Sequence, residues 1–269
     1  MKKLLSLTTL ALAAASAAHA QHAVEVLSYT PGAAPSAGYT NTAAALGQPQ
    51  RDTDFGEVSP FNPPFSTDDL VSIGEGGQIT LRLSNFAIPQ AGGPEIGVFT
   101  NTGLIDVDWP NGQAGTGVDF GAFGIDSASV AVSSDGASWV GLGDFTFDNP
   151  TAGYTDAAFT NPSDFQLPFT GAFADFEGLN FDAAMTLLGG SGGGLWLDIS
   201  ATGLSEVGYL RFSLADDQDA QTDLNFDLDA VAIASGAVGS ATVPEPAAAA
   251  LLLAALAFTT RRHVQPRRA

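Results

Sequence analysis

Two aspartates, Asp227 and Asp229, stand two residues apart in an apolar segment, Phe226–Ala234, that predicts a β-strand. Residues i and i+2 of a strand share a face, so both carboxylates should lie beside Val231 and Ile233. A carboxylate among buried aliphatic side chains is costly unless it is paired, hydrogen-bonded or metal-bound. Because Ca²⁺ prefers hard oxygen ligands, the pair indicates a structural calcium site. The alternative is a solvated acidic rim at the end of the strand.

The densest acidic stretch, residues 216–223, precedes that strand but does not have the spacing of an EF-hand loop. Counting from Asp217, the sixth position is Thr222 where the loop requires glycine, and the twelfth is Leu228 where it requires glutamate.

Residues 23–242 contain no histidine, cysteine or lysine, and His22 falls at the expected mature N-terminus, where it should be frayed. This composition excludes a Ser-His-Asp triad, a cysteine nucleophile, a Schiff-base lysine and a histidine-ligated zinc site within the range. Paired-carboxylate glycoside hydrolysis remains possible. No recognisable catalytic phrase marks such a pair, so we expect a protein without enzymatic activity.

Trp109 is followed by Pro110-Asn111-Gly112, a turn sequence, and is therefore expected in a loop. An exposed indole there would offer a flat surface on which a sugar ring can stack; the alternative is an anchor that packs the loop onto the domain. Trp139 and Trp196 fall in expected strands and should lie in the core.

The elements that must position these residues are short strands separated by glycine and proline. Gln78–Ser84 alternates polar and apolar residues, and Ser129–Ser133 and Trp139–Leu142 flank the turn sequence Ser-Asp-Gly of a hairpin. Further strands are expected at Val24–Tyr29, Ile96–Thr100, Phe145–Phe147, Leu195–Ser200, Tyr209–Leu214 and Phe226–Ala234. The pattern predicts an all-β protein, an antiparallel β-sandwich, with one short helix around Phe176–Leu188.

The first 20 residues have the features of a secretory signal peptide. A cationic start precedes an apolar run, Leu4–Ala15, and Ala18-His19-Ala20 provides small residues at the cleavage positions. Cleavage would leave Gln21 as the first residue. The alternative, an N-terminal membrane helix, is disfavoured by the shortness of the run.

The last 27 residues have three features in a fixed order. Val243-Pro244-Glu245-Pro246 precedes the apolar stretch Ala247–Phe258, and Arg261 and Arg262 follow. The apolar stretch is shorter than the ~20 residues of a comfortable bilayer span, and arginines favour the cytoplasmic side, so these features predict a short C-terminal anchor helix. The order resembles the PEP-CTERM sorting signal. That resemblance implies recognition by an exosortase and transient inner-membrane anchoring in a Gram-negative bacterium. It also implies delivery to the cell surface or to an exopolysaccharide matrix.

The range between these ends, 21–242, is strongly acidic and should form one domain. It holds 28 of the 29 acidic residues against three arginines, a formal charge of −25. Such a charge repels nucleic acid and is compatible with divalent cations or neutral sugars. The 18 phenylalanines argue for a packed core, which must hold without disulfides because the chain has no cysteine.

Several short sequence segments resemble segments of surface proteins with a galactose-binding, or discoidin-like, jelly roll. They include Tyr29-Thr30-Pro31-Gly32, residues 45–49, residues 71–77 and residues 93–99. Sugar-binding jelly rolls often join acids of the last strand to an acid of the first strand in a calcium site. The resemblance therefore implies that Glu25, on the expected first strand, joins Asp227 and Asp229.

These observations predict three segments: a signal peptide at 1–20, a β-sandwich at 21–242 and a sorting segment at 243–269. The expected function is that of an exported, non-catalytic surface or matrix protein that binds carbohydrate. Two alternatives remain open, a secreted glycosidase with paired carboxylates and a passive glycosylated coat protein.

Overall fold

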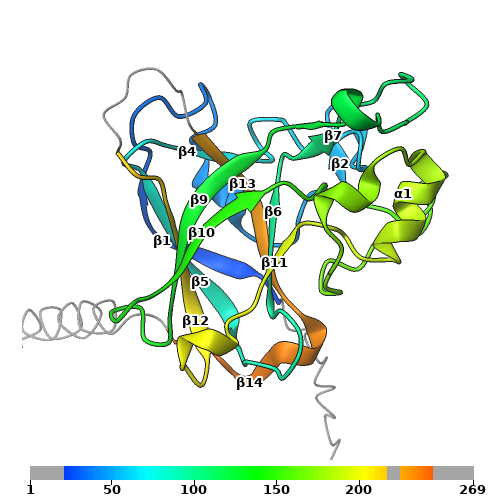
Figure 1. Cartoon of the computed structure of the whole chain (residues 1–269). Coiled ribbons are helices and arrows are strands. Elements are labelled where there is room, and N and C mark those ends of the chain that lie inside the picture. Colours follow the sequence, from blue (N-terminus) through cyan, green and yellow to red (C-terminus); the bar gives the residue numbers. More distant parts are fainter. Residues whose placement is uncertain (1–20, 217–224, 245–269) are drawn as a thin grey trace, which may run out of the picture.

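The computed structural model describes residues 21–216 and 225–244 (Figure 1). The regular secondary structure of these residues is mostly β, in antiparallel sheets, as the sequence predicted. Within this part of the chain, no helix is long and apolar enough to cross a bilayer. The expected signal helix and C-terminal helix lie outside the described residues.

The larger sheet has six strands, each antiparallel to its neighbours. The order across the sheet is β1 (Ala23–Thr30), β5 (Gln78–Ala87), β12 (Val207–Ser213), β9 (Asp126–Ser133) and β10 (Val140–Phe147), and β14 (Val238–Thr242) also pairs with β5.

The smaller sheet has four antiparallel strands, and two short ribbons lie outside both sheets. The order in the smaller sheet is β11 (Leu195–Leu197), β6 (Ile96–Thr100), β13 (Asn225–Ile233) and β4 (Val71–Gly74). The ribbons are β2 (Asp52–Thr53) with β3 (Gly56–Glu57), and β7 (Gly103–Leu104) with β8 (Ala122–Phe123).

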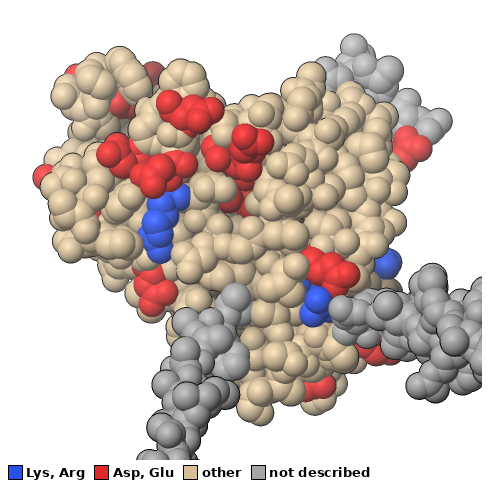
Figure 2. Space-filling model, turned by 180° about the vertical axis from the view of Figure 1, so that it is seen from behind, with Lys and Arg blue, Asp and Glu red and all other residues tan. Residues whose placement is uncertain are grey.

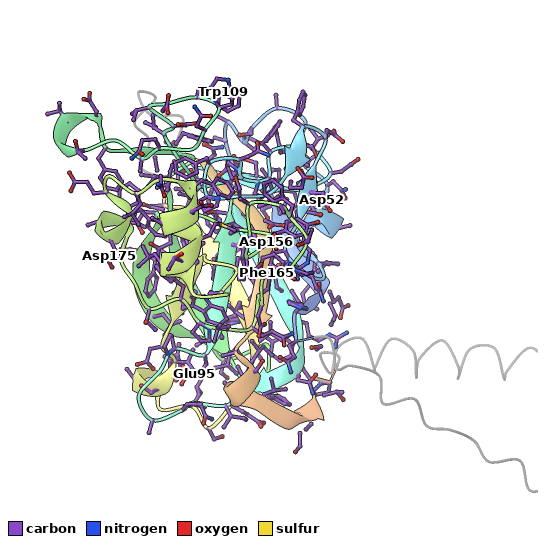
Figure 3. All side chains as sticks on the ribbon, turned by 90° about the vertical axis from the view of Figure 1, so that its right-hand side faces the viewer. Asp52, Glu95, Trp109, Asp156, Phe165 and Asp175 are labelled. Atoms are coloured by element: carbon purple, nitrogen blue, oxygen red, sulfur yellow. The ribbon has the colours of Figure 1, made fainter. Side chains whose placement is uncertain are left out.

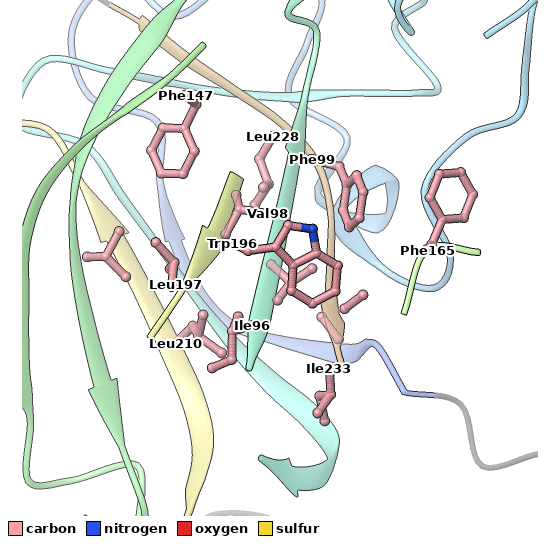
Figure 4. Packing of buried hydrophobic residues seen from close by; sticks show 14 of the residues in the cluster. Ile96, Val98, Phe99, Phe147, Phe165, Trp196, Leu197, Leu210, Leu228 and Ile233 are labelled. Carbon is pink, nitrogen blue, oxygen red and sulfur yellow. The ribbon is translucent and has the colours of Figure 1, made fainter. Parts of the chain in front are cut away.

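One hydrophobic cluster is shared by the two sheets. Phe226 of β13 lies 4.9 Å from Phe147 of β10 and 5.3 Å from Phe212 of β12, measured between ring centroids. Figure 4 shows Leu210 of the larger sheet near Ile96 of the smaller sheet, and both belong to this cluster. Burial of these side chains is the main source of stability available to a chain without cysteine.

The helix α1 (Phe181–Leu188) begins at Asn180, whose side chain accepts a hydrogen bond from the Ala183 N–H at 2.9 Å. It ends at Gly189, which takes the left-handed conformation (φ +61°) that stops helices. The predicted helix over residues 176–188 is therefore real but shorter. Short 3₁₀ turns occur at η1 (Thr42–Ala45), η2 (Gly117–Asp119), η3 (Phe173–Phe176), η4 (Ser200–Thr202) and η5 (Ser235–Ala237).

Three expectations need correction. The segments 139–142 and 145–147 belong to one strand, β10, whose register against β9 shifts between Gly141 and Gly143. The strand expected over 195–200 ends at Leu197. His22 is not frayed: it is 2% exposed and bridges to Ala232 of β13, so the first described residues belong to the core.

The backbone of residues 31–35 passes so close to β4 that only glycine fits at position 74. A Cβ atom on Gly74 would lie 1.9 Å from the carbonyl oxygen of Ala33. The Gly74 N–H also donates to the Pro31 carbonyl at 2.7 Å, so the two segments cannot separate without losing this bond.

We therefore expect Gly74→Ala to lower the free energy of unfolding by about 1–3 kcal/mol, the usual cost of overpacking. Gly236→Ala is the matched control, because a Cβ atom there meets nothing within 4 Å. Urea unfolding of both variants measures the difference. Equal stability of the two would contradict the close approach of residues 31–35.

Candidate functional site

Trp109 lies in the loop between β7 and β8 and is 77% exposed (Figure 3). The loop is held by the carboxylate of Asp106. It accepts hydrogen bonds from the backbone N–H groups of Asp108 and Gln113 at 2.9 Å and of Gly112 at 3.0 Å. The alternative of a packed anchor does not describe Trp109, because its indole extends from a fixed loop into solvent.

A hollow of about 490 Å³ lies beside this indole. Its lining consists of Phe61, Asn62, Pro63, Phe65, Leu104, Ile105, Asp106, Trp109 and Phe123. Phe65 also stacks on Phe55, which is 76% exposed, at 5.1 Å between ring centroids. We call Phe55, Phe65, Trp109 and Phe123 together the aromatic surface. Its rings come from three separate segments, the region around β2 and β3, the Trp109 loop and β8.

Trp196 lies in a strand and in the core, as predicted, whereas Trp139 precedes β10 and is half-buried. Trp196 is 9% exposed and donates from Nε1 to the Gly193 carbonyl at 2.9 Å. Trp139 packs against the core, with the guanidinium of Arg211 3.9 Å from its ring centroid. Trp109 is therefore the tryptophan that is accessible to a ligand.

Asp227 and Asp229 are 7% and 0% exposed, so the alternative of a solvated acidic rim does not describe them. Asp227 accepts hydrogen bonds from the side-chain amides of Asn225 at 3.0 Å and Asn101 at 3.3 Å. Asp229 accepts from the Gln50 N–H at 3.1 and 3.3 Å. Burial raises the pKa of Asp227 and raises the pKa of Asp229 well above its ordinary value.

Asp126, which the sequence interpretation missed, lies directly beside Asp227. Its Oδ2 accepts the Asp227 backbone N–H at 2.8 Å. Burial raises the pKa of Asp126 to about 7, and the nearby charge of Asp227 adds to the shift. Asp126 also lines a hollow of about 380 Å³ together with Asn225 and Asp144.

A sequence signal for Asp126 was present. Ala128, Val130 and Val132 are buried at alternate positions of β9, and extending that alternation back by two residues places Asp126 on the same face.

Glu25 does not join these aspartates. It forms an ion pair with Arg82, with 2.6 Å between Oε2 and Nε, and its side chain is 40% exposed. Within residues 21–216 and 225–244, no three histidine, cysteine or acidic side chains form a metal-binding group. The expected set of Glu25, Asp227 and Asp229 is therefore not assembled. The acids Asp217, Asp219 and Asp223 lie outside the described residues, and calcium binding by the chain stays a prediction.

The first two residues of the sorting motif are held by the domain. Val243 is 2% exposed, its N–H donates to the Ser84 carbonyl at 3.1 Å, and its carbonyl accepts from Arg82 Nη1 at 3.0 Å. The Tyr209 hydroxyl donates to the Pro244 carbonyl. The contacts of the domain thus continue past residue 242 to Pro244.

The remaining sorting and cleavage residues, Glu245, Pro246, Arg261, Arg262, Ala18 and Ala20, lie outside the described part of the chain. Gln21 is the first described residue, and its carbonyl accepts the Ile233 N–H at 2.7 Å.

Comparison of this chain with known protein families and with curated proteins finds no match.

The raised pKa of Asp126 makes stability depend on pH. The folded pKa of Asp126 lies above the value of about 3.9 for unfolded aspartate. The stability that the folded state gains from a protonated Asp126 is therefore fully present below pH ~4, and it is lost as the pH rises through about 7. Asp126→Asn keeps an acceptor for the Asp227 N–H but cannot ionise. We expect it to remove on the order of 4 kcal/mol of the fall in unfolding free energy between pH 4 and 8.

Urea unfolding at several pH values measures this slope. Asp135→Asn is the control. Hydrogen bonds from the Ser138 and Ala137 N–H groups lower the pKa of Asp135 to about 2, so its effect on the unfolding free energy falls below the range of pH 4 to 8. An unchanged slope in Asp126→Asn would contradict the burial of this carboxyl.

Removing the hydroxyl that holds Pro244 should loosen the junction with the tail. We expect Tyr209→Phe to lower the unfolding free energy by about 1 kcal/mol, the net value of one hydrogen bond. Tyr154→Phe is the matched control, because its hydroxyl bonds Asp52 at the surface at 2.9 Å. If both variants lose the same stability in thermal unfolding, the Pro244 contact has no special role.

Proposed function

We propose that this chain is an exported, non-catalytic surface or matrix protein that binds carbohydrate at its aromatic surface. The observation that carries the proposal is the 77% exposure of Trp109 beside a hollow of about 490 Å³. Exposed apolar patches beside a concavity with a few polar groups are typical of ligand sites. Asn62 and Asp106 supply polar groups in the lining of this hollow.

The geometry of the rings supports a sugar as the ligand. An indole offers a flat apolar face that matches the C–H face of a sugar ring and brings little conformational freedom to be lost on binding. The Trp109 loop is fixed by three backbone hydrogen bonds to Asp106, so the indole is positioned before the ligand arrives. Such preorganisation lowers the entropic cost of binding.

For the fold, we propose a jelly-roll-like β-sandwich similar to galactose-binding domains. Two antiparallel sheets that share one hydrophobic cluster support this architecture. The proposal also includes a structural calcium ion, which would be bound by residues other than the expected set of Glu25, Asp227 and Asp229.

For the cellular address, we propose export by the signal peptide and sorting by an exosortase, with transient anchoring in the inner membrane of a Gram-negative bacterium. The protein would then reach the cell surface or the exopolysaccharide matrix. The order of motif, apolar stretch and arginines after Val243 supports this route. In Figure 1, β14, which precedes Val243 in the sequence, lies at the end of the molecule opposite β7.

A second candidate function, glycoside hydrolysis, is favoured by one observation. Asp126, with a pKa of about 7, lines a hollow and contacts Asp227. A carboxyl that holds its proton near neutral pH is suited to act as a general acid. Its Oδ2 is already occupied by the Asp227 N–H, and this favours a structural role for Asp126.

Binding of the full chain, purified in a mild detergent, to exopolysaccharide from the encoding organism tests the proposal. We expect Trp109→Ala to weaken binding at least about tenfold, a loss of about 1.4 kcal/mol, and Trp109→Phe to lose less. Leu167→Ala is the control, because Leu167 is exposed but lies outside the aromatic surface.

The same experiment separates the candidates. Polymer that shortens with the native chain but not with Asp126→Asn would establish the glycosidase instead. Binding that disappears with a calcium chelator would add the metal to the account. Binding that does not change in Trp109→Ala would overturn the aromatic surface as the site.

A further inference from the structure

We propose that the aromatic surface selects glycans that carry protonated amines, such as partly de-N-acetylated amino sugars, over neutral glycans and excludes anionic ones. This inference rests on the proposed function and adds the charge of the ligand. It follows from the side chains around the rings.

Acidic residues stand next to residues of the aromatic surface in the sequence. Asp54 precedes Phe55 in the turn between β2 and β3, and Asp108 precedes Trp109; both aspartates are exposed. Asp106 lines the hollow itself. Figure 2, seen from behind, shows acidic side chains gathered in the upper part of the molecule, the end that carries β2 and β7.

These acids differ in what they can offer to a ligand. The oxygens of Asp106 are occupied by three backbone N–H groups, so this residue contributes negative charge rather than a free acceptor. Asp108 accepts one bond, from the Asn111 side chain at 3.2 Å, and keeps an exposed carboxylate. Asp54 and Asp108 are therefore the exposed carboxylates next to aromatic-surface residues in the sequence, and Asp108 also lines a second hollow of about 440 Å³ with Asn180 and Asp182.

The three arginines of the domain are held by other contacts, and Arg51 also interacts electrostatically with Asp52 and Asp164. Arg51, the nearest in sequence, lies with its guanidinium 4.4 Å from the Phe165 ring centroid and donates to the carbonyls of Gly153 and Ser163. Arg82 pairs with Glu25, and Arg211 stacks on Trp139. The range 21–242 contains no lysine.

The energies favour an ammonium ligand. A carboxylate attracts an ammonium more strongly near a protein surface than in bulk water, because the effective dielectric constant is lower. An ammonium over an indole face is attracted further by the negative face of the ring. A uronate or sulfate on the same rings would meet repulsion of similar size.

The same charge argues against two other occupants. An anionic membrane surface would be repelled by the acids beside the rings. A second copy of the chain would bring its own Asp54 and Asp108 towards those of the first, so like charges would meet across the interface. A glycan with amines has a complementary charge.

The test measures binding of the full chain, in a mild detergent, to three oligosaccharides of equal length. They are a glucosamine oligomer, its N-acetylated counterpart and a galacturonate oligomer, each titrated by calorimetry at about 20 mM and about 500 mM salt. At low salt we expect the amine oligomer to bind at least tenfold more tightly than the N-acetylated one, and the uronate not to bind. High salt should reduce the difference, because screening acts over about 3–20 Å in this range.

Variants assign the effect to residues. Asp54→Asn with Asp108→Asn should bring the amine oligomer to the affinity of the N-acetylated one and leave the latter unchanged. Trp109→Ala should weaken both. Glu206→Gln is the control, because it removes one negative charge outside the aromatic surface. Glu206 directly precedes β12, whose first residue, Val207, pairs with Ala87, and Ala87 also pairs with Val238 of β14.

Each outcome decides the inference. Equal binding of the amine and N-acetylated oligomers, or binding of the uronate, overturns the charge selection and leaves the proposed function intact. No binding of any oligomer or of the native polymer overturns both. A dimer in sedimentation equilibrium that dissociates in Trp109→Ala would show that the surface is occupied by a second copy.

Discussion

The contact of Phe226 with Phe147 and Phe212 joins the two sheets, and the rest of the structure depends on it. Phe226 lies on β13, whereas the other two rings lie on β10 and β12. The chain has no cysteine, and residues 21–242 hold 28 acidic residues, which repel one another, against three arginines. Burial of apolar surface between the sheets must outweigh that repulsion, because folded proteins are stable by only about 5–15 kcal/mol.

The same strand, β13, also carries buried carboxyl groups, whose removal from water opposes folding. Asp227 and Asp229 are buried on β13, and Asp126 contacts the first of them. Amide and backbone N–H donors around these carboxyls, together with raised pKa values, replace the counter-charges that the composition does not provide. The arginines make other contacts: Arg51 stacks on Phe165, Arg82 pairs with Glu25, and Arg211 stacks on Trp139. Among the described residues, none of these arginines lines the hollow of the aromatic surface, where Asp106 is the charged lining residue.

Much of the fold could be predicted from the sequence, because period-two alternation and glycine turns are local signals. Residues 78–84 and the hairpin around Asp135 are examples. The phase of Asp227 and Asp229 with Val231 and Ile233 indicated a buried face but left a solvated rim open, and β13 is in fact buried on both faces. The ion pair of Glu25 with Arg82 could not be predicted, because it depends on which strands become neighbours. The position of Phe65 beside Trp109 also depends on how distant loops meet, as does the contact of Asp126 with Asp227.

The central claim is that Trp109 contacts the ligand. Fluorine NMR of the chain labelled with 5-fluorotryptophan tests it most directly, because the three tryptophans give three resonances and Trp109→Phe assigns one of them. On addition of the glucosamine oligomer, we expect the Trp109 resonance to shift in a saturable manner while those of the packed Trp139 and Trp196 stay in place. Saturable binding that leaves the Trp109 resonance unchanged, or that moves only the other two, would contradict the account.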